Sequence, residues 1–304
     1  SLRGEVLGTV LNQFSMDEHG DTFRVATTTR DFFFGGASAN NLYVMNADMK
    51  VIGKLENLAP GEQIFSARFM GSRCYVVTFR RVDPLFVISL ANPEAPAVLG
   101  QLKIPGFSDY LHPYDDNHII GFGKDSEDGL YQGMKVACFD VSDVTTPLQK
   151  YAISIGDRGT SSEVLYNHKA LLFDKAKDLI AFPISVMEIK NKTANTPAWT
   201  YGEPVFQGAH VYTFTLETGF ILRKAITHES AQPKPAVDFF FDYGSIIRRL
   251  LYIDANLYSV SDSKIHVHDL NTLDEKRIVL GQHRRLFLIV AKLKAKVRCL
   301  RIPR

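Results

Sequence analysis

The stretch "LFVISLANPEAPAVLGQL", residues 85–102, decides the fold. It begins with an apolar run rich in β-branched residues, passes through Asn-Pro and Ala-Pro, and ends in a second short apolar run. Proline and asparagine between two such runs are typical of a turn that joins two strands. Four further segments repeat this pattern, at residues 41–58, 135–153, 210–226 and 265–280.

Each of the five segments follows a second predicted hairpin, at residues 10–29, 64–79, 109–123, 163–186 and 246–262. The repeating unit is therefore four antiparallel strands. The shortest spacing between successive copies, from Leu42 to Leu85, is 43 residues, which matches the roughly 40–50 residues of one propeller blade. A four-stranded sheet has two apolar faces, and radial stacking of such sheets covers both. The sequence predicts an all-β β-propeller with five readable blades, complete or part of a larger propeller.

The predicted domain boundaries follow the repeat. Residues 1–282 form the propeller, with blades at about 10–58, 64–104, 109–155, 163–228 and 246–282. Residues 283–304 hold eight Lys or Arg and no acid, which leaves 27 basic and 33 acidic residues elsewhere. We interpret this basic tail as an edge strand protected by lysines or as a non-native end, and expect no nucleic-acid partner.

Composition places the chain among globular proteins. Its 304 residues are 45% hydrophobic and 22% charged, and no window reaches the roughly 18 apolar residues of a transmembrane helix. Cys74 and Cys138 lie in predicted strands, where we expect buried free thiols, and Cys299 lies in the basic tail.

Several long motifs resemble a known family. They include "FMGSRCYVVTFRRVDPLFVISL" (69–90), "PGFSDYLHPYDDNHIIGFGKD" (105–125), "GDRGTSSEVLYNHKALLF" (156–173) and "LYSVSDSKIHVHDL" (257–270). Over about residues 8–280 the chain is similar to secreted archaeal and bacterial proteins that carry a C-terminal β-propeller distantly related to WD repeats. The resemblance implies an extracellular or cell-surface location and a longer parent protein. It supplies no catalytic residues, and the tail after Gln282 departs from the pattern.

The variable loops are those between the second and third strands of the blades, at residues 30–40, 80–84, 124–133 and 187–208. In a propeller these loops share one face with the links between blades, and loops on a rigid scaffold often bind ligands. The aromatic residues there either anchor a partner or fold back over the central channel. The candidate binding residues on this face are Phe32, Phe33, Phe34, Arg80, Arg81, Asp83, Asp109, Asp157, Arg158, Trp199 and Tyr201.

Three groups of residues suggest metal ligands. Asp125, Glu127 and Asp128 resemble the start of a calcium loop, but the downstream acid is missing and a solvated turn is the favoured interpretation. The segment 109–118 gathers Asp and His residues that a strand and a turn separate, which disfavours zinc. His266 and His268 lie on one face of a predicted strand, and without a third ligand in view we interpret them as packing or solvent-facing residues.

No linear catalytic motif is present: the sequence has no Gly-x-Ser-x-Gly, no His-Glu-x-x-His and no phosphate-binding loop. The predicted function is a non-catalytic binding or scaffold module of the cell envelope that holds a protein or glycan on the loop-bearing face. The alternative is a hydrolase or lyase with a carboxylate and Arg site in the central channel, which predicts a cavity lined by these groups with perturbed titration. Self-association through exposed blade edges is a further expectation.

Overall fold

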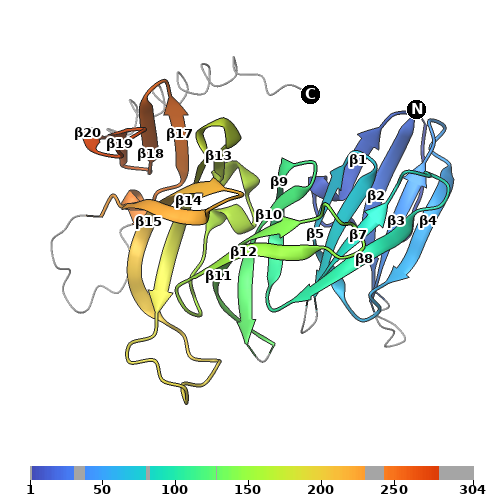
Figure 1. Ribbon diagram of the computed structural model, residues 1–304, viewed down its shortest axis with the longest axis horizontal. Helices are drawn as coiled ribbons and strands as arrows, with labels where there is room; N and C mark the ends of the chain where they lie inside the picture. The colour runs from blue at the N-terminus through green and yellow to red at the C-terminus, as the bar shows by residue number, and fades with distance from the viewer. Residues whose placement is uncertain (1, 31–37, 80–82, 128, 230–242, 281–304) are drawn as a thin grey trace. The chain divides into compact units, whose positions relative to one another are not determined.

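The computed structural model describes residues 2–30, 38–79, 83–127, 129–229 and 243–280. These residues form five four-stranded antiparallel sheets, each with its strands in chain order (Figure 1). The predicted all-β fold built from five four-stranded units is confirmed. Among the described residues there is no helix with the length and apolar character that crossing a membrane requires.

The chain divides into two compact units, which we describe separately. The first comprises Ser1–Ser161 with Met187–Glu203, and the second comprises Ser162–Val186 with Pro204–Arg304. The first unit contains one 3-10 helix, Gln13–Ser15, and three sheets: β1 (Met16–His19), β2 (Thr22–Thr29), β3 (Ala39–Met45), β4 (Val51–Leu58); β5 (Gln63–Met70), β6 (Arg73–Phe79), β7 (Asp83–Ser89), β8 (Ala97–Ile104); and β9 (Phe107–Asp115), β10 (His118–Glu127), β11 (Leu130–Asp140), β12 (Leu148–Ile155).

The β5–β8 sheet is buried on both faces. Along β6, Cys74 and Val76 pack into an apolar cluster with the β1–β4 sheet, whereas Tyr75 and Val77 pack into another with the β9–β12 sheet. This follows from strand geometry, because successive side chains point to opposite faces. The β5–β8 sheet therefore lies between the other two (Figure 1).

Two glycines let neighbouring sheets of the first unit approach closely. Gly53 on β4 faces the turn after β7, where an added Cβ would lie 2.0 Å from the carbonyl oxygen of Pro93. Gly100 on β8 faces the corresponding turn of the next sheet, and its Cβ would lie 2.3 Å from the carbonyl oxygen of Val144. In the β5–β8 and β9–β12 sheets, the turn that recurs in the sequence thus packs on the outer strand of the preceding sheet.

The described residues of the second unit form two sheets and four 3-10 helices. The sheets comprise β13 (Leu172–Asp174), β14 (Leu179–Glu188), β15 (Glu203–Thr215), β16 (Gly219–Ile226), and β17 (Arg249–Ile253), β18 (Asn256–Val260), β19 (Lys264–Asp269), β20 (Glu275–Leu280). The helices are Glu163–Leu165, His168–Ala170, Lys175–Lys177 and Tyr243–Ser245. One apolar cluster joins the two sheets; Ala181 and Val211 come from one, and Leu250 and Leu257 from the other.

Cys74 and Cys138 are buried free thiols, as predicted. Burial raises the pKa of Cys138 to about 12, because the charged thiolate is disfavoured away from water. Cys299 lies outside the described residues.

The close approach at Gly100 gives a first prediction. We expect Gly100→Ala to lower the free energy of unfolding by about 1–3 kcal/mol, because a methyl group there forces the β8 strand away from the Val144 turn. Gln101→Ala, at the exposed next position of the same strand, is the control and should change stability by no more than about 0.5 kcal/mol. Urea unfolding measures both, and equal effects would contradict the close-packing argument.

Candidate functional site

The connections between strands define one face of the first unit, which we call the loop face. It carries the β2–β3, β6–β7 and β10–β11 connections, the links β4–β5 and β8–β9, and the segment after β12. These connections share one end of the sheets because every strand pair within a sheet is antiparallel. Of the predicted binding residues that the structure describes, Asp83, Asp109, Asp157 and Arg158 lie in these connections or next to them, and Trp199 and Tyr201 lie in the loop between β14 and β15.

The segment that follows β12 anchors the long loop between β14 and β15, which runs through residues 189–202 (Figure 1). The backbone N–H of Asp157 donates to the carbonyl oxygen of Met187 at 2.6 Å, and that of Gly202 donates to the carbonyl oxygen of Arg158 at 2.8 Å. The Asp157 carboxylate accepts from the Ile189 N–H at 2.8 Å and from the Lys192 ammonium at 2.6 Å. Both ends of the loop are therefore fixed to the same short segment.

These hydrogen bonds also control the charge of Asp157. Burial acts to raise the pKa of its carboxyl, but the hydrogen bonds from Lys192 and Ile189 outweigh burial and hold the pKa below its usual range. Asp157 is thus a charged anchor for the loop.

Arg158 and Tyr201 form the central contact of the loop face. The Arg158 guanidinium lies 4.7 Å from the centre of the Tyr201 ring and donates to the carbonyl oxygen of Tyr131 at 2.9 Å. Gly159, at φ +106°, makes this possible, because an added Cβ would lie 3.1 Å from Met187 and 3.4 Å from the Tyr201 ring. Tyr201 remains 66% exposed. Its ring therefore presents an open surface backed by a positive charge.

Trp199 lies two residues earlier in the same loop and is 68% exposed. The adjacent carbonyl oxygen of Ala198 accepts a hydrogen bond from the Gln132 side chain at 2.9 Å, which ties this part of the loop to β11. The loop thus exposes two large aromatic side chains from a backbone that several hydrogen bonds hold.

An aromatic cluster continues from this contact toward the β5–β8 sheet. Tyr131 packs against Phe107 and Phe79 with ring centres 4.9 and 5.6 Å apart. Phe65 in turn packs against Phe107 at 4.8 Å and Phe79 at 5.5 Å. The sequence analysis overlooked these four residues. Each is an aromatic residue at the loop-face end of its strand or within two residues of that end, and this shared position could have identified them.

A cavity of about 370 Å³ lies next to Phe65 on the loop face. Asp109, Gln63 and Arg30 contribute polar groups to its lining, and Thr9, Val10 and Leu11 form another part of the wall. Arg30 donates a hydrogen bond to the Gln63 side chain. Burial raises the pKa of Asp109 to about 7, against the opposing charge of Lys124. A carboxyl group that is partly protonated near neutrality can donate as well as accept a proton.

Among the predicted residues, the structure brings Asp157, Arg158 and Tyr201 together and places Trp199 in the same loop. Asp109 belongs to the neighbouring cavity instead. Asp83 begins β7, where its backbone pairs with Ile104. Phe32, Phe33, Phe34, Arg80 and Arg81 lie outside the described residues.

The candidate calcium residues lie in the β10–β11 hairpin. Asp125 occupies a β-bulge between Lys124 and Ser126, and its carboxylate accepts from the Ser154 hydroxyl at 2.7 Å. Glu127 pairs with Leu130 at the end of the hairpin. Asp128 lies outside the described residues, so the calcium hypothesis stays a prediction.

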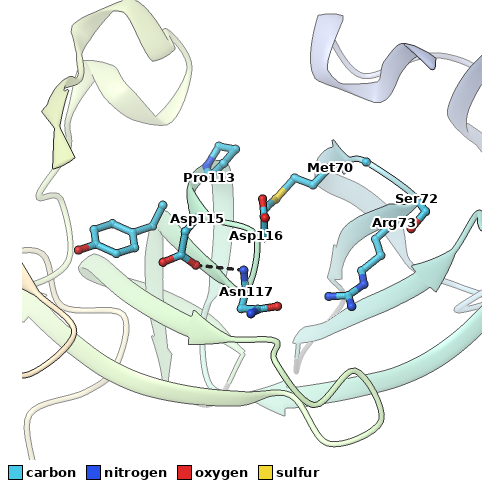
Figure 2. Close-up of a pocket in the computed structure, with 9 residues that line it drawn as sticks. Met70, Ser72, Arg73, Pro113, Asp115, Asp116 and Asn117 are labelled. Atoms are coloured by element: carbon cyan, nitrogen blue, oxygen red, sulfur yellow. Dashed lines mark hydrogen bonds between the residues drawn. The ribbon is translucent and has the colours of Figure 1, made fainter. Parts of the chain in front are cut away.

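The Asp and His residues of 109–118 separate as the strand pattern predicts. Asp109 lies near the loop end of β9, whereas Asp115 lies at the opposite end and accepts from His118 at 2.8 Å. The turn lines a pocket of about 550 Å³ opposite the β5–β6 turn. Figure 2 shows Arg73 on one side of this pocket and Asp115, Asp116 and Asn117 on the other. The β9–β10 turn, which contains Asp116 and Asn117, is of the kind that Asp and Asn ordinarily form.

The repeated four-stranded sheets and their loop face define a β-propeller domain. Residues 1–273 match the family described as "Beta propeller domain", and the chain belongs to this family. An uncharacterized protein of Methanocaldococcus jannaschii is 35% identical over 271 residues, which cover 88% of this chain and 36% of the relative. An uncharacterized protein of Archaeoglobus fulgidus is 34% identical over 270 residues, which cover 89% of this chain and 35% of the relative. The chain thus spans about a third of the length of these relatives.

Two solved structures share the fold class at low similarity. The β-propeller domain of Cps50 (Swd1) from Myceliophteria thermophila is 9% identical, with a TM-score of 0.35 and coverage of 82% of this chain and 70% of that one. The WD40 domain of Pan2 from Neurospora crassa is 12% identical, with a TM-score of 0.42 and coverage of 88% and 79%. At these values neither likeness bears on function.

The buried carboxyl gives a pH prediction. The folded pKa of Asp109, about 7, lies above the ordinary value of 3.8 for this carboxyl group, so between these pH values the folded state holds a proton that the unfolded state has lost. Stability should therefore fall as the pH rises from about 4 to about 7. Asp109→Asn should remove this fall and make the protein more stable than the wild type at pH 8 by roughly 2–4 kcal/mol.

Denaturant unfolding at several pH values measures this effect. Asp21→Asn removes an exposed carboxyl in the β1–β2 turn and is the control, with the pH dependence of the wild type retained. If stability depends on pH in the same way for Asp109→Asn and for the wild type, the raised pKa does not belong to Asp109.

Proposed function

We propose that this domain is a non-catalytic binding module that holds its ligand on the loop face of the first unit. The observation that carries the proposal is the Arg158–Tyr201 stack, with the Tyr201 ring still largely open to solvent. Exposed aromatic rings beside an arginine are typical of surfaces that anchor ligands. The module would act within a longer protein of the cell envelope, extracellular or at the cell surface, which the resemblance to exported propeller proteins supports.

Of the two ligand classes expected, protein and glycan, the local chemistry favours a glycan. Trp199 and Tyr201 present flat rings on which the apolar face of a sugar can stack. Charged groups are also present: Arg158 lies against the Tyr201 ring, and Lys190 of the same loop forms an exposed ion pair with Glu203, the first residue of β15. A stable protein interface usually has an apolar centre depleted in charged residues, whereas Tyr201 lies directly against the guanidinium of Arg158.

Self-association is a separate expectation. The outer strands expose apolar side chains, among them Ile221 and Leu222 on β16 and Ile278 and Leu280 on β20. Exposed apolar edges are sites at which strands of another chain can pair. This expectation stays a prediction.

The alternative function, a hydrolase or lyase, is supported by one observation. Asp109 lines a cavity together with Arg30, and its pKa of about 7 suits a general acid or base. Among the described residues that line this cavity, however, Asp109 is the single carboxyl group. Carboxylate-dependent hydrolases usually need two, and the binding function is therefore preferred.

A binding experiment tests the proposal directly. Purified full-length chain is applied to a glycan array and, separately, to extracted envelope proteins. We expect retention on one or more glycans, and a loss of affinity of at least about 30-fold in Tyr201→Ser and in Trp199→Ser, because each change removes an anchoring ring. Arg158→Ala should weaken binding as well, since Tyr201 then loses its stacking partner.

Tyr166→Ser is the matched control, because Tyr166 is an exposed tyrosine of the second unit. It should leave binding unchanged. If the chain retains envelope proteins but no glycan, the ligand is a protein rather than a glycan. Equal binding by all variants, each shown to be folded by circular dichroism, would exclude the loop face as the site.

A further inference from the structure

A cluster of histidines lies within the last sheet of the second unit. His266 and His268 are two residues apart on β19, are 7% and 3% exposed, and share one face of the strand. The sequence analysis interpreted them as packing or solvent-facing residues because no third metal ligand was in view. In the structure both histidines are packed in the sheet, and a carboxylate lies beside them.

The carboxylate comes from Glu275, the first residue of the neighbouring strand β20. Val267 pairs with Arg277, and His268 would pair with Lys276 if the register continued. A β-bulge shifts the register there, and His268 pairs with Glu275 instead. Paired residues lie on the same face of a sheet. The bulge thus replaces a cation by a carboxylate beside the histidines, as bulges next to functional sites do when they redirect a side chain.

Lys276 is engaged elsewhere. Its ammonium lies 2.7 Å from the Asp269 carboxylate and donates to the Asn256 side chain at 3.0 Å.

The three side chains are spaced as ligands of one ion. Glu275 Oε2 lies 3.0 Å from Nδ1 of His266 and 4.0 Å from Nε2 of His268. One ligand atom from each residue can be chosen so that all lie within 4.8 Å of one another. A tetrahedral zinc ion with bonds of about 2.0–2.1 Å holds its ligands about 3.3 Å apart. Small rotations of these side chains would bring their donor atoms to that spacing.

Buried nitrogen atoms in the cluster lack hydrogen bonds. Nδ1 and Nε2 of His266 and Nδ1 of His268 are buried without a hydrogen-bond partner in the described structure. The contact of His266 with Glu275 has the distance of an ion pair but not the alignment of a hydrogen bond. Buried polar atoms are rarely left unsatisfied. A bound cation would provide a partner for one nitrogen of the His266 ring.

His228 forms a wall of the cluster rather than a ligand. Its ring stacks on that of His266 with centres 4.0 Å apart. Its Nδ1 and Nε2 already bond to the hydroxyl groups of Ser261 and Ser259 at 2.9 and 2.8 Å. The stacking and the hydroxyl bonds hold the His266 ring in place, as supporting residues do around metal ligands.

Two lysines near the cluster restrict the kind of ion. Lys224 donates to the carbonyl oxygen of Leu273 at 2.6 Å, and Lys264 donates to that of His228 at 2.7 Å. Their positive charge opposes a cation held only by electrostatic attraction, such as Ca²⁺ or Mg²⁺. Ions of the zinc group bind imidazole strongly and are favoured by a donor set of two nitrogens and one oxygen.

We propose that His266, His268 and Glu275 bind one divalent transition-metal ion of the zinc class. Three protein ligands leave a coordination position for water or a ligand group. The Glu275 side chain is 45% exposed, which gives the ion a route from solvent. The ion would join β19 to β20 through their side chains in addition to the backbone ladder. This site is independent of the proposed function of the loop face, which belongs to the other unit.

The test uses the full chain after dialysis against a chelator. Calorimetric titration with Zn²⁺ alone should show one ion bound per chain, and excess Ca²⁺ or Mg²⁺ should not displace it. Co²⁺ in place of Zn²⁺ should give the visible absorption bands of a four-coordinate site. His268→Gln and Glu275→Gln should each lower the Zn²⁺ affinity by about 100-fold or more, since loss of a direct ligand should exceed the 10–100-fold cost of losing its supporting contacts.

His19→Gln is the matched control, because His19 is an exposed histidine of the first unit, and it should bind as the wild type does. Thermal unfolding of the wild type should shift to higher temperature with Zn²⁺, and this readout does not depend on any variant being folded. Absence of binding to the wild type would overturn the proposal. So would binding that survives both ligand substitutions in folded protein, because the ion would then lie elsewhere in the chain.

Discussion

Burial of both faces of a sheet by its neighbours is the constraint on which the rest of this structure depends. In β6, consecutive residues belong to different apolar clusters: Cys74 and Val76 face one neighbouring sheet, and Tyr75 and Val77 face the other. A sheet used in this way presents mainly apolar residues on both faces, and its buried polar residues, such as Ser66 and Thr78, form hydrogen bonds. The exposed side chains of the loop face therefore lie at strand ends and in connections, whereas His266 and His268 are buried on one face of β19.

The same constraint explains how much of the fold the sequence predicts. Strands and turns depend on neighbouring residues, so the apolar runs on either side of Asn92-Pro93 predict β7, β8 and the turn between them. The repeat of that pattern predicts five four-stranded sheets, which the structure contains. The close approach at Gly53 and Gly100 was not predicted, because the glycine and the turn that it faces belong to different sheets.

The candidate sites also depend on contacts between residues that are far apart in the sequence. Loop position alone was enough to select Arg158 and Tyr201, but their stacking depends on the anchoring of residues 189–202 to the segment after β12. The pKa of Asp109 depends on burial by distant segments such as Thr9–Leu11 and Gln63–Phe65. Glu275 was missed because simple alternation along β20 places Lys276 opposite His268. The β-bulge shifts the register by one residue and pairs His268 with Glu275 instead. A shift of one residue changes the charge beside the histidines, and local sequence patterns do not specify such a shift.

Anchoring also bears on how the loop face would bind. A long loop that exposes aromatic side chains normally loses conformational entropy when a ligand orders it. Here the Asp157 carboxylate, the backbone bonds at Met187 and Gly202, and the contact between Gln132 and Ala198 already restrain the loop. The rings of Trp199 and Tyr201 are thus exposed while their backbone is held, which lowers the entropic cost of ligand binding. Because these restraints come from the segment after β12 and from β11, the sheets that bury each other's faces would also hold the loop face in place for the proposed ligand.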